Sequence, residues 1–154
     1  LETYRNDAYT EALGLTFLQD NLSYSSYGTI RGLHFQREPY AQAKLVRCPY
    51  GEILDVAVDI REDSPSFGKH VSVVLSSVNQ KQFFIPAGFA HGFVVLSKEA
   101  IVEYKCSNYY HPDSDAGIFY NDEQLGISWM IPIEERILSE KDLSLPCLGS
   151  ITRS

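Results

Sequence analysis

The sequence lacks the features that mark several large classes of protein. No apolar run approaches the ~20 residues that a membrane helix needs, and the polar first residues are unlike a secretory signal. Basic residues are scarce, with 13 Lys and Arg against 20 Asp and Glu and a net charge of -7. This balance argues against a nucleic-acid partner, because binding a phosphate backbone needs clustered cations on one face. A small phosphorylated ligand is still allowed, since two or three local cations suffice to hold one.

Cysteine is also sparse, and its pattern excludes two kinds of stabilised small domain. Cys48, Cys106 and Cys147 are an odd number and include no C-x-x-C pair, so neither a disulfide framework nor a zinc knuckle is indicated. A reducing cytoplasm is therefore the expected location. The 154 residues are expected to form one domain, 1–154, because that length can bury a substantial core without a second domain.

The residues that are abundant are typical of β-sheets. The chain has 10 Tyr, 8 Phe and 1 Trp, which favour a β-rich fold with stacking surfaces. After a weakly helical stretch at residues 2–13, short segments rich in Val, Ile, Phe and Tyr alternate with Gly, Pro, Asn and Ser turns. They predict strands at residues 29–36, 43–48, 52–60, 70–76, 82–85, 92–96 and 101–109. Such even spacing indicates a sandwich or a barrel.

One predicted strand, residues 53–60, alternates clearly between two faces. One face is wholly aliphatic, and the other includes Asp55 and Asp59. Under the usual apolar-inside rule the acidic face meets solvent. In a barrel with a wet pocket it would instead line the cavity. The alternation alone leaves both interpretations open.

Residues 86–92, PAGFAHG, match the second half-motif of cupin barrels, in which a tight turn is followed by an inward histidine, here His91. A histidine bonded to a backbone carbonyl is the alternative. Metal-binding cupins add an H-x-H pair and a glutamate, and no such pair surrounds His34. Two imidazoles make a poor metal site, and Asp55 is the only nearby third candidate. No metal and no cofactor are therefore expected.

A longer series of motifs indicates which family of proteins the chain resembles. The series is RGLHFQ at 31–36, QAKLVR at 42–47, GEILDVAVDIR at 51–61, SPSFG at 64–68, IPAGFAHGF at 85–93, and then Tyr104-Lys105, Tyr109-Tyr110 and Asn121-Asp122. In collinear order over residues 17–142 it resembles the dTDP-4-dehydrorhamnose 3,5-epimerase family. The resemblance implies an all-β, cupin-type jelly-roll β-barrel with short flanking helices. It also implies a metal-independent isomerase acting on a dTDP-linked 4-keto-6-deoxy sugar, in the biosynthesis of rhamnose or a related deoxysugar.

Epimerisation beside a ketone requires four kinds of group. A ketone at C4 acidifies the protons on C3 and C5, so a base can remove one, an enolate forms, and a proton returns on the opposite face. The site therefore needs a base, an acid across the ring, a cation at the enolate oxygen and groups that hold the diphosphate.

His34 suits the base, because an imidazole with a pKa of about 6.5 can accept a proton near neutral pH. The resemblance implies that Asp142 is its carboxylate partner. Asp142 also lies three residues after Ser139, so the pattern S-x-x-D is equally that of a helix capping box. The residues alone leave these alternatives open, and the resemblance favours the His–Asp dyad.

The acid and the cation are assigned by the resemblance. Tyr104 matches the family's proton donor on the opposite face, although a strand tyrosine can equally belong to a core or a rim. Lys44 matches the lysine near the enolate oxygen. Its alternative is a lysine whose ammonium extends to solvent at the barrel rim.

Arg31 matches a phosphate-binding arginine, a role that suits its planar, bidentate donors. Strict alternation along a strand would send Arg31 and His34 to opposite faces. If both line the pocket, a bulge or kink is expected near Gly32.

Five further residues are predicted to bind the substrate. Gln19, Asn21 and Ser23 resemble the family's polar contacts to nucleotide and sugar, with a turn cluster as the alternative. His91 is expected to point into the same pocket. Tyr110 is expected to stack on the thymine or pack along the sugar.

The sequence departs from the family pattern in places. It starts downstream of the family's D-x-R-G-x-F motif, so it is expected to lack N-terminal strands and to expose a barrel edge. His70 and Tyr120 stand where tryptophan is common, and Met130-Ile131-Pro132 replaces the usual W-P. These changes touch the pocket lining or the core. A homodimer is expected, with neither nucleic acid nor membrane as a partner.

Alternative functions share much of this pattern. A single-site epimerase or a ketoisomerase of the same family would use the same base. A non-catalytic sugar-nucleotide-binding cupin would keep Arg31 and Tyr110 but lose His34, Lys44 or Tyr104, all of which are present. A metal-dependent cupin would need a third inward ligand.

Overall fold

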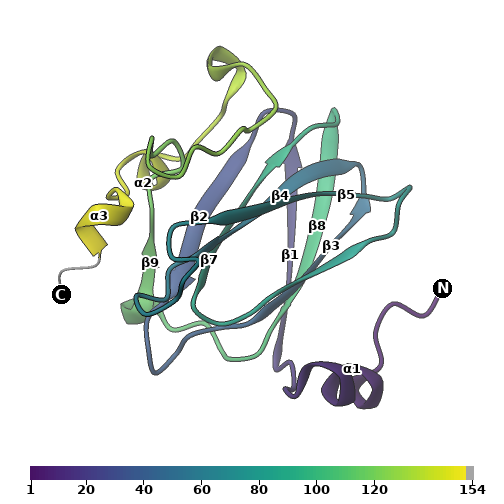
Figure 1. Ribbon diagram of the computed structural model, residues 1–154. Helices are drawn as coiled ribbons and strands as arrows, with labels where there is room; N and C mark the ends of the chain where they lie inside the picture. The colour runs from purple at the N-terminus through teal and green to yellow at the C-terminus, as the bar shows by residue number, and fades with distance from the viewer. Residues whose placement is uncertain (152–154) are drawn as a thin grey trace.

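Two antiparallel sheets packed face to face form the body of the computed structural model, which describes residues 1–151 (Figure 1). The strands are β1 (Gln19–Ser26), β2 (Ile30–Gln36), β3 (Lys44–Tyr50), β4 (Glu52–Asp59), β5 (His70–Ser76), β6 (Gln82–Ile85), β7 (Phe89–Val95), β8 (Glu99–Cys106) and β9 (Asp115–Gly117). One sheet has the order β1-β8-β3-β6 and the other β5-β4-β7-β2-β9. The first eight strands thus form the two four-stranded sheets of a jelly roll, with β9 added at one edge, and the predicted all-β fold is confirmed.

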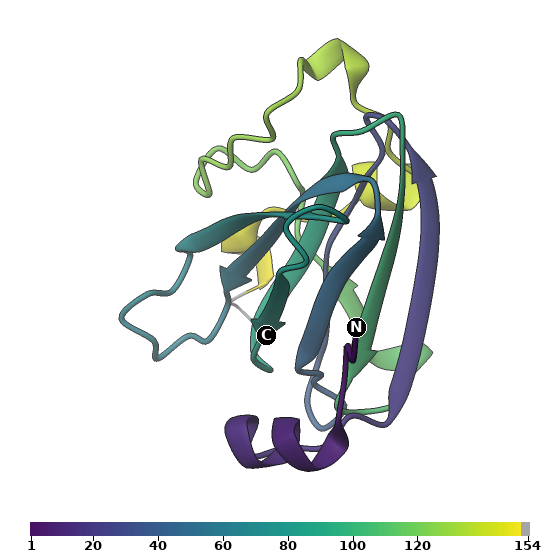
Figure 2. The ribbon, with the colours of Figure 1, turned by 90° about the vertical axis from the view of Figure 1, so that its right-hand side faces the viewer.

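Short helices flank the sheets, as predicted. They are α1 (Asn6–Leu13), α2 (Glu140–Leu143) and α3 (Leu148–Ile151), together with the 3-10 turns Pro112–Ser114 and Ile133–Glu135. In both views α1 lies at the bottom, below the strands, while the yellow-green segment near residue 130 lies at the top (Figures 1 and 2). Within residues 1–151, no helix is long and apolar enough to cross a membrane.

All seven predicted strands are present, two of them (β5 and β6) with the predicted ends and five with shifted ends, and two further strands escaped prediction. β1 was missed because Gln19, Asn21 and Ser23 occupy the alternate positions where a strand normally shows apolar residues. β9 is only three residues long. The polar residues of β1 are therefore part of a strand, and their interpretation as a turn cluster was wrong.

Both faces of β4 are buried, each against a different partner. Val56 and its aliphatic neighbours pack against a C-terminal segment that includes Ile118 and Trp129. The other face lies between the sheets, where Ala57 packs in the second core cluster. Asp55 and Asp59, which share this inner face, are 0% and 1% exposed, so of the two interpretations left open, the one in which the acidic face meets solvent was wrong.

Tyr120, where the family often has tryptophan, belongs to the core. Its ring lies 5.9 Å from that of Trp129, and its carbonyl accepts a hydrogen bond from the Trp129 indole at 3.0 Å. It therefore supports the sheet from outside and does not line the pocket.

The space between the sheets is divided into an apolar end and a polar end. The apolar end is filled by a cluster that includes Val46, Ile53, Leu75, Val95 and Val102. Along β8, Val102 belongs to this cluster, whereas Tyr104 and Cys106, on the same face, line a cavity. The same inner face of the strand thus packs in the core at one end and lines the open pocket at the other.

The predicted irregularity in β2 is confirmed. The pairing of β2 with β7 shifts register between Arg31 and His34. Gly32 lies there with φ +120°, and a Cβ atom on it would come within 2.6 Å of the Cα of Gly92, so only glycine fits. The shift sends Leu33 into the core beside β4 and allows both Arg31 and His34 to face the cavity.

Candidate active site

The polar end of the barrel contains two adjoining hollows of about 290 and 240 Å³, which share His34, Lys44, Tyr104 and Lys141. Every residue predicted for the site lines one or both of them: His34, Lys44, Tyr104, Asp142, Arg31, Gln19, Asn21, Ser23, His91 and Tyr110. The fold therefore brings together side chains from both sheets and from the C-terminal helix α2.

His34 and Asp142 form the predicted contact. The His34 Nε2 lies 2.6 Å from Asp142 Oδ1, and the Asp142 side chain is only 6% exposed. Burial opposes ionisation of this carboxyl, but the hydrogen bond from His34 and its other bonds together lower the pKa of Asp142. With Nε2–H donated to the carboxylate, Nδ1 of a neutral His34 is left with the lone pair that can accept a proton.

The capping interpretation of Asp142 is met only in part. The Ser139 hydroxyl accepts the backbone N–H of Asp142 at 3.1 Å, as an N-cap does. The Asp142 carboxylate bonds to His34 and, weakly at 3.5 Å, to the Gly32 amide. Ser139 therefore begins α2 and fixes the backbone that carries Asp142, while the carboxylate itself faces the imidazole.

Tyr104 lies on β8, paired with Asn21 of β1 on one side and Val46 of β3 on the other. Burial raises the pKa of its phenol, and nearby Arg31 opposes the shift. At neutral pH the phenol is consequently protonated and can act as a proton donor.

Lys44 extends into the cavity from β3. Its ammonium lies 5.8 Å from the centre of the Tyr104 ring, which places it inside the cavity beside that phenol. Burial lowers the pKa of Lys44, whereas Cys106, Asp55 and Asp115 raise it. Within residues 1–151 its ammonium forms no ion pair, so it is available to a ligand.

His91 is held by a carboxylate, so the backbone-carbonyl alternative was wrong. Its Nε2 lies 2.7 Å from Asp55 Oδ1, and the side chains are 6% and 0% exposed. Burial lowers the pKa of His91 more than Asp55 raises it, so the imidazole is neutral and donates Nε2–H. Sequence reasoning placed Asp55 on a face that meets solvent or lines a cavity, and named it as a possible metal ligand, but not as the partner of His91. No group of three residues able to hold a metal occurs among residues 1–151.

The predicted substrate-binding residues form a polar wall beside this centre. Arg31 donates to the Ser25 hydroxyl at 3.1 Å, and the buried Ser23 hydroxyl has no partner within residues 1–151. Gln19 donates to the Asn21 side chain at 3.1 Å and accepts the backbone N–H of Tyr110 at 2.9 Å. These contacts leave Arg31 and Ser23 with unused capacity for an anionic ligand.

Sequence reasoning missed Lys141 at the mouth of the cavity. It lines both hollows and pairs with Asp115 of β9, beside the half-exposed Tyr110. Little in the sequence indicates this position for Lys141, because α2 is a single turn and is too short to show helical periodicity. Its position next to Asp142 was the only indication available.

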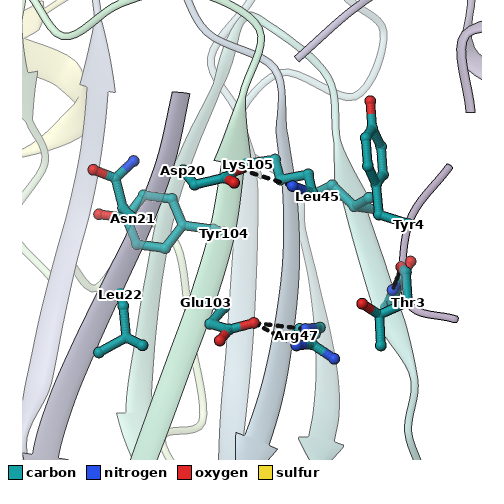
Figure 3. A pocket seen from close by; sticks show the side chains of 11 residues that line it. Thr3, Tyr4, Asp20, Asn21, Leu22, Leu45, Arg47, Glu103, Tyr104 and Lys105 are labelled. Carbon is teal, nitrogen blue, oxygen red and sulfur yellow. Dashed lines mark hydrogen bonds and ion pairs between the residues drawn. The ribbon is translucent and has the colours of Figure 1, made fainter. Parts of the chain in front are cut away.

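A third hollow, of about 330 Å³, lies on the outer face of the four-stranded sheet (Figure 3). Its charged side chains are already paired: Lys105 with Asp20 at 2.8 Å, and Arg47 with Glu103. Figure 3 shows these two pairs lying across β1, β8 and β3. Tyr104 also borders this hollow, but its described lining residues include no histidine and their cations are paired, so it lacks the His–Asp contact and the free ammonium of the polar end.

The jelly roll and its polar pocket define the class as a cupin-type protein with an acid–base site. A family model described as dTDP-4-dehydrorhamnose 3,5-epimerase matches residues 1–150. The dTDP-4-dehydrorhamnose 3,5-epimerase of Escherichia coli K12 is 53% identical over 154 residues, 99% of this chain and 83% of that protein. The chain belongs to the dTDP-4-dehydrorhamnose 3,5-epimerase family, and the predicted family and isomerase class are thereby confirmed.

Solved structures agree with this assignment. A dTDP-6-deoxy-D-glucose-3,5-epimerase from Legionella pneumophila, in complex with dTDP-4-keto-L-rhamnose, matches with a TM-score of 0.93 and 50% identity, over 97% of this chain and 80% of that one. A 3'-monoepimerase from Streptomyces bikiniensis, in complex with dTDP-quinovose, matches with a TM-score of 0.92 but 33% identity, over 99% of this chain and 77% of that one. The fold is thus shared by double and single epimerases, and the sequence lies nearer the double epimerase.

Proposed function

We propose that this chain epimerises both C3 and C5 of dTDP-4-keto-6-deoxyglucose by proton transfer beside the C4 ketone, as a step toward rhamnose or a related deoxysugar. The observation that carries this proposal is the His34–Asp142 contact of 2.6 Å in the cavity that also contains Lys44 and Tyr104. A base, a cation and an acid therefore surround one space.

His34 acts as the base through Nδ1. Asp142 accepts the Nε2 hydrogen, which fixes the imidazole orientation and stabilises the imidazolium that forms when a sugar proton is taken. The lowered pKa of Asp142 supports this role, because the carboxylate is ionised at neutral pH and can stabilise a positive charge on the imidazole.

Lys44 and Tyr104 complete the proton transfer. The Lys44 ammonium, which has no ion pair within residues 1–151, stabilises the negative charge that develops on the C4 oxygen. Tyr104 delivers a proton to the other face of the sugar, and its raised pKa keeps the phenol protonated until that step. Inversion results because the base and the acid approach the same carbon from opposite sides.

The polar wall holds the nucleotide. Arg31, Lys141 and the unpartnered Ser23 hydroxyl are suited to the diphosphate, with Lys141 exchanging Asp115 for a phosphate oxygen. Gln19 and Asn21 are suited to polar groups of the nucleotide and sugar. Tyr110, which is 51% exposed, offers its ring to the base.

Proton NMR in deuterated water tests the reaction. Purified protein incubated with dTDP-4-keto-6-deoxyglucose is expected to introduce deuterium at both C3 and C5, and His34→Ala is expected to introduce none. Deuterium at one carbon alone would indicate a single-site epimerase. This is the second candidate function, because one of the similar solved structures is a monoepimerase. Absence of label at either carbon would contradict the proposal and favour a binding protein.

The chain is also proposed to form a homodimer in the cytoplasm. Leu18, Leu22 and Tyr24 lie on one side of the outer edge of the four-stranded sheet, where Asp20 between them is paired with Lys105, and these three residues and Tyr50 are all at least half exposed. An unpaired edge strand with an apolar outer face is a common site of self-association. The three free cysteines fit a reducing compartment.

A further inference from the structure

Asp55 is a buried carboxylate with one oxygen unused. Its side chain is 0% exposed, and Oδ1 accepts the His91 Nε2 hydrogen at 2.7 Å. Oδ2 has no hydrogen-bond partner within residues 1–151. A buried, half-satisfied carboxylate is costly, so its retention in the middle of β4 calls for a physical reason.

His91 does not neutralise this charge. Burial lowers the pKa of His91, so at neutral pH the imidazole donates a hydrogen bond without carrying a positive charge. The negative charge of Asp55 is therefore left to act on other groups around the cavity.

Among the described residues, Lys44 is an unpaired group of opposite sign, and Asp55 is among the charges that act on it. Lys44 lines the same hollow of about 290 Å³ as His91, and its ammonium forms no ion pair within residues 1–151. Burial favours the neutral amine, whereas attraction to Asp55 favours the ammonium. A neutral amine could not stabilise an enolate electrostatically.

The other titratable groups around Lys44 are poor substitutes for Asp55. They are Cys106 and Tyr104 of β8, Tyr110 after β8, His34 and Arg31 of β2, His91 of β7, Asp115 of β9, and Lys141 and Asp142 of α2. Burial raises the pKa of both Cys106 and Tyr104, so both are uncharged at neutral pH. Asp115 is engaged by Lys141 and Asp142 by His34. Among residues 1–151, Asp55 is consequently the carboxylate in this part of the pocket that has a buried oxygen without a partner.

We propose that Asp55 is a positioning residue, which uses its free carboxylate oxygen to keep Lys44 charged while its other oxygen fixes His91. The proposal rests on the proposed function of Lys44 at the enolate oxygen. It separates two roles for one side chain, an electrostatic role toward Lys44 and a hydrogen-bonding role toward His91.

The variant Asp55→Asn separates the roles, because asparagine can still accept the His91 hydrogen bond but has no charge. The alkaline limb of the pH profile of kcat reports the loss of the Lys44 proton. In Asp55→Asn this limb is expected to move to lower pH by about one unit or more, since a neighbouring charge shifts a pKa by that order. His91→Gln, which leaves the Asp55 charge in place, is expected to keep the limb at its wild-type position.

Direct titration of Lys44 covers the case in which Asp55→Asn is too slow to assay. Protein labelled with ¹³C at the lysine ε-carbon is titrated by NMR, with Lys44→Met identifying the resonance. The Lys44 resonance is expected to titrate at lower pH in Asp55→Asn than in wild type. An unchanged Lys44 titration in folded Asp55→Asn, or an alkaline limb that moves as far in His91→Gln, would overturn the proposal. Failure of the proposed function is distinguishable, because it would leave the wild type without deuterium exchange.

Discussion

At the scale of single residues, Asp142 shows why sequence alone left two interpretations open. The pattern S-x-x-D predicts a helix cap, and the structure contains one, yet the carboxylate contacts an imidazole 108 positions earlier in the chain. The short-range pattern could be interpreted from the sequence, whereas the long-range contact depends on where α2 lies against β2. The family resemblance, and not local chemistry, identified the correct partner.

Replacing Asp142 with asparagine tests the dyad. The asparagine side chain would keep the shape but would neither hold the catalytic tautomer of His34 nor stabilise its protonated form. We expect Asp142→Asn to lower kcat at least about a hundredfold. Steady-state kinetics measure this, with circular dichroism as the control for folding. An activity within a few-fold of wild type would assign Asp142 to the helix cap alone.

Asp59 carries a prediction about stability and pH. Its bonds to Arg61, Ser64 and Ser66 overcome burial and hold the pKa of its carboxyl below the ordinary value of 3.8. Asp59 therefore stabilises the fold fully above about pH 4, and this contribution is lost as the pH falls through its lower, folded-state pKa. We expect Asp59→Asn to be less stable than wild type at pH 7, with the difference shrinking below pH 4, as measured by urea unfolding. A difference that is the same at pH 7 and pH 3 would contradict this.

At the scale of elements, hydrophobic patterning located four of the five strands that carry site residues but not β1, which carries three of those residues. The seven predicted strands contain aliphatic and aromatic runs that indicate strands directly. β1 carries Asn21 and Ser23 on its inner face, and the polar residues of a pocket erase the apolar alternation on which strand prediction depends. The bulge at Gly32 could be predicted because the two residues that had to share a face are three positions apart.

Gly32→Ala tests the bulge. The added Cβ would meet Gly92 Cα at 2.6 Å at a φ of +120°, so we expect a loss of a few kcal/mol in the free energy of unfolding and misplacement of Arg31 and His34. Gly126→Ala is the matched control, since Gly126 has φ +59° but nothing within 4 Å of its Cβ position. That change should cost only about 1 kcal/mol. Equal losses in the two variants, measured by chemical denaturation, would show that close packing at Gly32 is unimportant.

At the scale of the whole molecule, the inner faces of the same strands form the apolar core at one end of the jelly roll and the polar cavity at the other. The predicted site residues come from five strands, α2 and the segment after β8, and all of them line the cavity. Lys141 was not assigned to it from the sequence, and the place of Asp55 behind His91 was left open. An aspartate alternating with aliphatic residues is also what a solvent-facing strand shows, and a lysine in a short helix is normally a surface residue.

The proposed homodimer is also a property of the whole molecule. Leu22 is 63% exposed on the outer face of the edge strand β1, away from the cavity. We expect Leu22→Glu to weaken self-association, because it places a charge in an apolar contact, and to leave the fold intact. Analytical ultracentrifugation measures the change, with Val78→Glu, at a 91% exposed position in the turn after β5, as the control. A wild-type monomer at all concentrations would contradict the homodimer.

The central claim is that His34 and Tyr104 act on opposite faces of one sugar, and Tyr104→Phe in deuterated water tests it most directly. Without the phenol, His34 can remove a proton and return a deuteron only to the face from which it came. We therefore predict that the recovered 4-keto sugar contains deuterium beside the ketone but keeps its original configuration. Inversion by Tyr104→Phe at the wild-type rate would show that the second proton comes from elsewhere and would contradict the account.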